Sequence, residues 1–139
     1  NQASFKTRIQ NDIRNELSLK LLGDIFFNPV SALTNSTLED IVKYKHTNQL
    51  AYKVMEEAYK IANKLDVKIP VSIAQRISGA GKVGPHKTSM LQDLESKRPM
   101  EIEPILGSII ELAKIMEIQI PHIETLYSCI KLLDKNNIQ

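Results

Sequence analysis

The chain is poor in the residues that most often identify a function. It contains no tryptophan, only 5% aromatic residues and a single cysteine, Cys129. So few aromatic rings offer no visible stacking platform for nucleic-acid bases. One cysteine cannot form an internal disulfide, which fits a reducing compartment. Because Cys129 lies in the segment Leu126–Ile130, we expect it to be a small buried side chain rather than a nucleophile.

An excess of charge of one sign and long apolar runs are also missing. The formal net charge is only +2, too small to indicate binding to nucleic acid or to an anionic membrane. No apolar run approaches the ~20 residues of a membrane helix. The first residues, Asn1 to Ser4, lead into charged residues and do not resemble a signal peptide. We therefore expect no nucleic-acid or membrane partner, and a cytoplasmic location.

Patterns that bind metal ions are absent as well. His46 and His122 are far apart in the sequence, and neither has a partner at the spacing of a metal ligand. Glu56 and Glu57 are adjacent, so on a helix their carboxylates point to different sides. We expect no metal site.

What the chain does contain is helical periodicity over almost its whole length. With 139 residues, 42% of them apolar, it suits one domain with its own core. Apolar residues recur every four positions from Ile9 to Ile25, which predicts a long helix, and Pro29 predicts a kink or a break. Further helices are expected after a cap at Ser36 or Thr37, over 50–61 and ending near Asp66, from Pro70 to Gly79 and Gly81, over 87–95, over 102–115, and from Pro121. The predicted fold class is all-α, with six or seven helices.

Gly79 to Gly84 spell GxGxxG, the pattern of a dinucleotide-binding turn. That turn needs a strand before it and a helix after it, so that the pyrophosphate meets a helix N-terminus. Here the preceding residues Ile73 to Ile77 have helical spacing, and Pro85 follows directly. We interpret the glycines as a flexible connection between helices and not as a nucleotide site.

Two segments carry a family resemblance. The first is Lys20-Leu21-Leu22-Gly23-Asp24-Ile25-Phe26-Phe27-Asn28-Pro29 with Ser31 to Thr34. The second is His86-Lys87-Thr88-Ser89-Met90-Leu91-Gln92-Asp93-Leu94-Glu95, continuing through Arg98-Pro99-Met100-Glu101-Ile102. In this order, about one small domain apart, they resemble the two signatures of the ketopantoate reductases (2-dehydropantoate 2-reductases).

The resemblance covers residues 1–139 and implies the helical C-terminal domain of such an enzyme, similar to the C-terminal domain of 6-phosphogluconate dehydrogenase. The implied reaction is reduction of 2-dehydropantoate to pantoate by NADPH, a step toward pantothenate and coenzyme A. The family's N-terminal Rossmann domain, which binds most of the cofactor, is absent from this chain. We therefore expect the chain to be inactive alone, to face a Rossmann domain of the same protein, and to be compatible with a homodimer.

The resemblance also implies roles for single residues. In the family the lysine of the K-x3-N-x3-N pattern is the general acid, and it matches Lys20. The two asparagines of the pattern bind substrate, and their positions are those of Asp24 and Asn28 here. Without the resemblance, Lys20 would be read as a solvated lysine. Positions i, i+4 and i+8 share one helix face, so Lys20, Asp24 and Asn28 are expected to point into a shared cleft. The family's substrate-binding serine matches Ser89, and the glutamate near lysine, substrate and cofactor matches Glu101.

Position 24 departs from the family, because Asp24 replaces an asparagine. An ionised aspartate cannot donate a hydrogen bond. It would repel a substrate carboxylate and could pair with Lys20 one turn earlier. Two alternatives therefore remain open: a reductase of another small 2-oxo acid, and a helical interaction or dimerisation module without catalytic activity.

Overall fold

The computed structural model describes residues 13–138, with side chains from Lys20 to Asn137. Its elements in chain order are α1 (Ile13–Thr34), α2 (Leu38–Lys43), α3 (Lys45–Lys64), α4 (Ile73–Lys82), α5 (Ser89–Glu95), the π-helical turn η1 (Glu103–Gly107), α6 (Ser108–Ile115) and α7 (Pro121–Ile138). No strand occurs within residues 13–138. The all-α prediction is confirmed.

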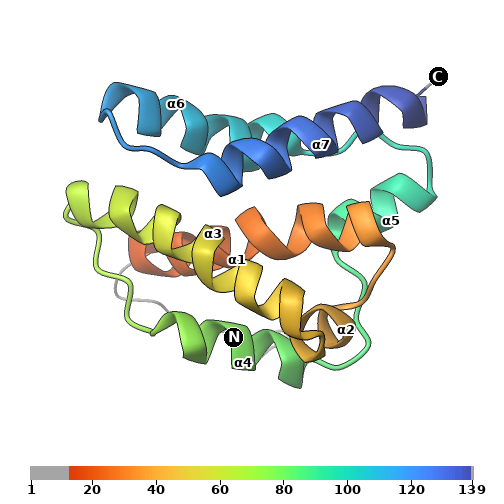
Figure 1. Ribbon diagram of the computed structural model, residues 1–139, viewed down its shortest axis with the longest axis horizontal. Helices are drawn as coiled ribbons and strands as arrows, with labels where there is room; N and C mark the ends of the chain where they lie inside the picture. Colours follow the sequence, from red (N-terminus) through yellow and green to blue (C-terminus); the bar gives the residue numbers. More distant parts are fainter. Residues whose placement is uncertain (1–12, 139) are drawn as a thin grey trace, which may run out of the picture.

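Helix α1 is the central element (Figure 1). It packs against α3, α5 and α7, while α6 and α7 lie on one side of the molecule and α2 and α4 on the other. Its apolar face is deeply buried: Ile25 is 2% exposed and Phe26 is 0% exposed. Side chains at this depth contribute most of the hydrophobic stabilisation of a domain of this size. The helix that carries the first family signature is therefore held firmly in the core.

The predicted break at Pro29 is wrong, while a kink there stays a prediction. The helix continues through Pro29 to Thr34. A proline inside a helix removes one backbone hydrogen bond and costs about 3 kcal/mol. The neighbouring Phe26 and Val30 are 0% and 3% exposed, so burial on both sides of the proline offsets that cost. Tertiary packing overrides the local signal.

The glycines of the GxGxxG stretch are also placed differently from the prediction. Gly79 and Gly81 lie inside α4, not in a connection after it. A Cβ on Gly81 would lie 2.9 Å from Val42 Cγ1, so this glycine lets α4 approach α2 closely. Gly84 alone takes a left-handed conformation, with φ +85°, and forms the turn. These glycines lie within or directly after α4, whereas the nucleotide turn would follow a strand.

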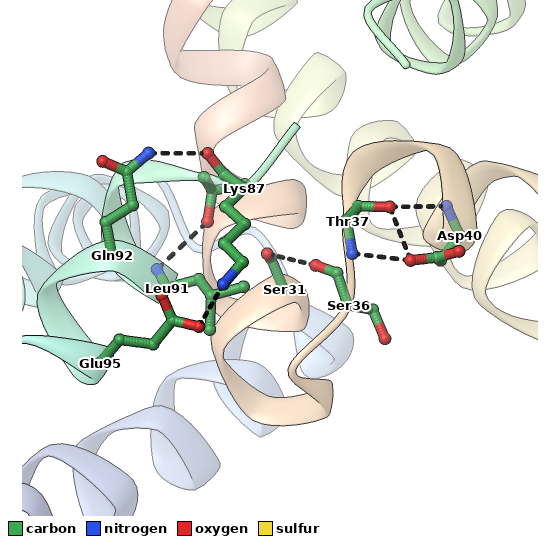
Figure 2. A network of polar contacts seen from close by, with 9 residues as sticks. Ser31, Ser36, Thr37, Asp40, Lys87, Leu91, Gln92 and Glu95 are labelled. Carbon is green, nitrogen blue, oxygen red and sulfur yellow. Dashed lines mark hydrogen bonds and ion pairs between the residues drawn. The ribbon is translucent and has the colours of Figure 1, made fainter. Parts of the chain in front are cut away.

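Polar caps fix where the short helices begin (Figure 2). Thr37 accepts a hydrogen bond from the Asp40 N–H, and the Asp40 carboxylate accepts one from the Thr37 N–H. This capping box confirms the predicted start after Thr37. Ser72 caps α4 in the same way, so that helix begins at Ile73 and not at Pro70. Thr88 caps α5, which begins two residues later than expected.

Cys129 is exposed on α7, so the prediction of a buried thiol is wrong. Ile123 and Ile130 are 0% exposed and set the buried face of this helix. Cys129 is one residue, or about 100° around the helix, away from Ile130. The apolar residues near it in sequence therefore lie on a different side of α7.

None of the helices within the described range combines the length and the apolar character needed to cross a lipid bilayer.

Candidate functional site

An open cleft of about 300 Å³ lies beside α1, α4 and the start of α5. Its lining includes Gly23, Asp24, Phe27 and Asn28 from α1, Arg76 from α4, and Ser89 from α5. The volume is at the lower end of the roughly 300–1,000 Å³ typical of small-molecule sites. Residues of both signature segments thus meet at one hollow.

Helix α1 supplies the polar floor of this cleft. Asp24 and Asn28 are one turn apart and therefore share a face. Asn28 is only 6% exposed, and its amide forms no side-chain hydrogen bond with another described residue. An asparagine amide can donate hydrogen bonds to a ligand and accept hydrogen bonds from it.

Lys20 lies one turn before Asp24 and is exposed. It does not belong to the lining of the cleft. Burial raises the pKa of the Asp24 carboxyl, and the charge of Lys20 opposes this rise. The ammonium is therefore close enough to the cleft to interact electrostatically with its floor. Its role as proton donor stays a prediction.

Glu101 is not brought into this cleft. It is exposed and lies between α5 and η1, and it is not part of the lining. The preceding Met100 donates its N–H to Asp134 Oδ1 at 3.0 Å, which fixes the segment against α7. The expected roles of Glu101 toward substrate and cofactor stay predictions.

The segment before α5 forms the rim of the cleft, and backbone contacts hold it in place. Leu38 donates its N–H to the His86 carbonyl at 3.0 Å, linking the rim to the start of α2. Gln92 Nε2 donates to the Lys87 carbonyl at 3.0 Å, and Lys87 forms an ion pair with Glu95 (Figure 2). His86 and Ser89 line the cleft from this rim.

Arg76 is a site residue that sequence reasoning missed. Its guanidinium lies 5.9 Å from the centre of the Phe27 ring. A Cβ on Gly23 would lie 1.8 Å from Arg76 Nη2, so the guanidinium occupies space that only glycine leaves free. A glycine in the middle of a helix is unfavourable by up to about 1 kcal/mol relative to alanine. An unfavourable glycine within the predicted helix, at position 23, was the one signal in the sequence that another side chain packs there.

Burial and charge act in opposite directions on the cleft's ionisable groups. Burial raises the pKa of the Asp24 carboxyl, while the charges of Lys20 and Arg76 oppose this effect. Burial lowers the pKa of the Arg76 guanidinium, and Asp24 opposes it. An arginine stays protonated in proteins, so the cleft holds a permanent cation next to a carboxyl that is harder to ionise than usual.

The described residues do not by themselves form a dinucleotide or metal site. A Rossmann-type site needs parallel strands, and residues 13–138 contain none. In the same part of the chain, no group of three or more His, Cys, Asp or Glu side chains is placed to hold a metal ion.

The comparison with curated proteins identifies relatives named 2-dehydropantoate 2-reductase. One from Mesorhizobium japonicum is 43% identical over 132 residues, covering 95% of this chain and 40% of the relative. One from Nostoc sp. is 30% identical over 119 residues, covering 85% of this chain and 37% of the relative. The chain thus spans well under half the length of these relatives.

Solved structures agree on the fold. A 2-dehydropantoate 2-reductase from Methylococcus capsulatus superposes with a TM-score of 0.85 at 29% identity, covering 94% of this chain and 45% of that one. A PanE/ApbA family ketopantoate reductase from Ralstonia eutropha JMP134 superposes with a TM-score of 0.86. The two chains are 24% identical, and the match covers 94% of this chain and 44% of that one. At that identity the second likeness shows the fold alone.

The family comparison is the most direct. Residues 12–134 match the model described as "Ketopantoate reductase PanE/ApbA C terminal". This range includes both signature segments and every residue named in the cleft. The chain therefore belongs to the ketopantoate reductase family and corresponds to the C-terminal domain of its members.

Proposed function

We propose that the protein containing this chain reduces 2-dehydropantoate to pantoate with NADPH, and that this domain provides the substrate side of the active site. The observation that carries the proposal is the cleft, where Asp24 and Asn28 from one signature meet Ser89 from the other. Membership of the family and the names of the relatives support the same reaction.

NADPH supplies the hydride in such a reaction, and a nucleotide-binding domain of the same protein holds it. The residues described here contribute binding and proton transfer. We assign Lys20 as the general acid that donates a proton to the carbonyl oxygen as it becomes a hydroxyl. The ammonium lies beside the cleft floor, where its charge already acts on Asp24.

The remaining cleft residues orient the substrate. The Asn28 amide and the Ser89 hydroxyl each donate and accept hydrogen bonds, which suits a molecule with hydroxyl, carbonyl and carboxylate groups. Asp24 lies between Lys20 and Asn28 and contacts the bound acid or its neighbours. Glu101 is proposed to complete the site when the nucleotide-binding domain closes the cleft and brings the cofactor near.

The proposal also covers assembly and location. On this proposal the nucleotide-binding domain forms the opposite wall of the cleft, so we expect no turnover from residues 1–139 alone. A cytoplasmic location and a homodimer are proposed as well. Ile115 and Leu132 are 72% and 60% exposed and offer apolar surface for an interface. Sedimentation of the complete protein tests the dimer.

A steady-state assay tests the function. The complete protein is mixed with NADPH and with one acid at a time: 2-dehydropantoate, pyruvate or phenylglyoxylate. We expect the highest kcat/KM with 2-dehydropantoate and no turnover by residues 1–139 alone. Efficient turnover of a different acid would replace the proposed substrate, and no turnover of any acid would favour the interaction module.

A further inference from the structure

The Arg76 side chain is seated in a space that the sequence of α1 leaves open. It extends from α4 to α1, where a Cβ on Gly23 would collide with Nη2 at 1.8 Å. The Phe27 ring, 5.9 Å from the guanidinium carbon, packs beside it. Because both neighbours belong to the helix that also carries Asp24 and Asn28, the guanidinium is positioned by the same surface that forms the cleft floor.

Among the described residues, no direct contact neutralises this guanidinium. Its Nε atom is buried and has no hydrogen-bond partner within that part of the chain. Asp24 influences Arg76 electrostatically, but no described carboxylate lies within ion-pair distance of Arg76. Five N–H donors in a fixed plane are suited to a carboxylate, and an arginine held in place loses little side-chain freedom when it binds one. The cleft therefore contains a cation with unused hydrogen-bonding capacity.

We propose that Arg76 binds the carboxylate of the 2-oxo acid substrate, and that Asp24 is its counter-charge in the empty cleft. The inference rests on the proposed function, because it assigns one substrate group within that site. It also accounts for Asp24, which replaces the family asparagine. The Arg76 cation next to it offsets the repulsion between the Asp24 carboxylate and the substrate carboxylate.

The ligand class follows from charge and shape. A planar carboxylate can accept two parallel hydrogen bonds from one guanidinium. A dianionic phosphate would need more positive charge, and here Asp24 sits beside the single arginine of the cleft lining. A neutral ester or lactone would leave the guanidinium unpaired. The cleft should thus select monoanionic 2-oxo and 2-hydroxy acids.

The test uses the complete protein, Asp24→Asn, and three variants that alter Arg76 or its position. Arg76→Gln removes the charge, Arg76→Lys keeps the charge without the planar fork, and Gly23→Ala displaces the guanidinium without removing it. Arg98→Gln is the matched control, since Arg98 is exposed and pairs with Asp93 outside the cleft. Circular dichroism verifies folding, steady-state kinetics gives KM and kcat, and calorimetry measures binding of pantoate and of the neutral pantoyl lactone.

Arg76→Gln should raise KM for 2-dehydropantoate and weaken pantoate binding by about 10–100-fold, the range of a charge-assisted hydrogen bond. Arg76→Lys should recover part of the loss, Gly23→Ala should resemble Arg76→Gln, and Arg98→Gln should change neither value. Binding of pantoyl lactone should be weak in all variants. Asp24→Asn should lower KM, because it removes the competing negative charge.

Two results separate this inference from the proposed function. If the wild type reduces 2-dehydropantoate and Arg76→Gln leaves KM and pantoate binding unchanged, the inference is overturned while the function stands. If the wild type reduces no 2-dehydropantoate but binds pyruvate or another 2-oxo acid in an Arg76-dependent way, the inference stands and the proposed substrate fails. Binding of pantoyl lactone to the wild type as tight as that of pantoate would also overturn it.

Discussion

At the scale of single residues, Asp24 is an ionisable carboxyl in a partly buried position of the proposed substrate cleft. Its carboxyl is half buried, and desolvation raises its pKa above the usual 3.8 despite Lys20 and Arg76. A raised pKa in the folded state means that the native protein binds more protons than the unfolded chain between the two pKa values. Stability therefore falls as pH rises through this window.

The variant Asp24→Asn removes that ionisation. At neutral pH we expect its free energy of unfolding to equal or exceed that of the wild type, because no charge is desolvated. The advantage should shrink as the pH falls through the raised folded-state pKa of Asp24 toward 3.8, and it should be lost below 3.8, where the wild-type carboxyl is neutral in both states. Urea unfolding at several pH values measures this. A variant that is less stable at neutral pH would mean that attraction to Lys20 and Arg76 outweighs desolvation.

The sequence predicted some site residues and not others for a physical reason. Lys20, Asp24, Asn28 and Ser89 were expected because their motifs resemble those of the family, and helical spacing places the first three on one face. Arg76 could not be found in this way. Its position depends on the approach of α4 to α1 and on the missing side chain of Gly23, which are tertiary facts.

At the scale of elements, Glu57 joins two helices that are distant in sequence. It is 3% exposed, and its carboxylate accepts the N–H groups of His122 and Ile123 at 3.1 and 3.0 Å. These donors belong to the first turn of α7, which has no partner for them within its own helix. An acceptor on α3 thus caps α7 across the molecule.

Glu57→Gln should lower the free energy of unfolding by about 1–3 kcal/mol, because an amide supplies one acceptor oxygen where the carboxylate supplies two. The neighbouring Glu56→Gln is the control. Glu56 is exposed, so its change should stay within about 0.5 kcal/mol. Urea denaturation of both variants measures the difference. Equal effects would show that the cap does not contribute.

The glycines of α4 provide a second pair of matched variants. Gly79→Ala should stabilise the protein by about 0.5–1 kcal/mol, because alanine favours the helix and nothing lies within 4 Å of the added Cβ. Gly81→Ala should lose this gain, because its Cβ would lie 2.9 Å from Val42 Cγ1. Thermal unfolding compares them. If both variants gain equally, α4 and α2 are free to separate.

Element type was more predictable than element boundaries. The helices were read correctly because their apolar periodicity reflects burial on one side. The boundaries predicted at Pro29, Gly79 and Gly81 were wrong. Each of these residues disfavours a helix in isolation, but here each lies within one. The α1 proline is offset by core packing, and Gly81 is required by close helix contact.

At the scale of the whole molecule, we propose that the cleft is one side of an active site. The groups proposed to bind substrate lie on α1, α4 and α5, and Lys20 lies beside them. Exposure of Lys20 and Glu101 is consistent with groups that meet their ligands only when a second domain covers them. We propose above all that this domain contributes the proton donor for carbonyl reduction.

Steady-state NADPH oxidation by the complete protein with 2-dehydropantoate tests that claim most directly. Lys20→Ala should lower kcat by about 10²–10⁴-fold, the usual contribution of general acid catalysis. Lys114→Ala, at an exposed lysine of α6 outside the cleft, should leave kcat unchanged. A Lys20→Ala enzyme that keeps wild-type kcat while the wild type is active would contradict the assignment of the proton donor to this helix.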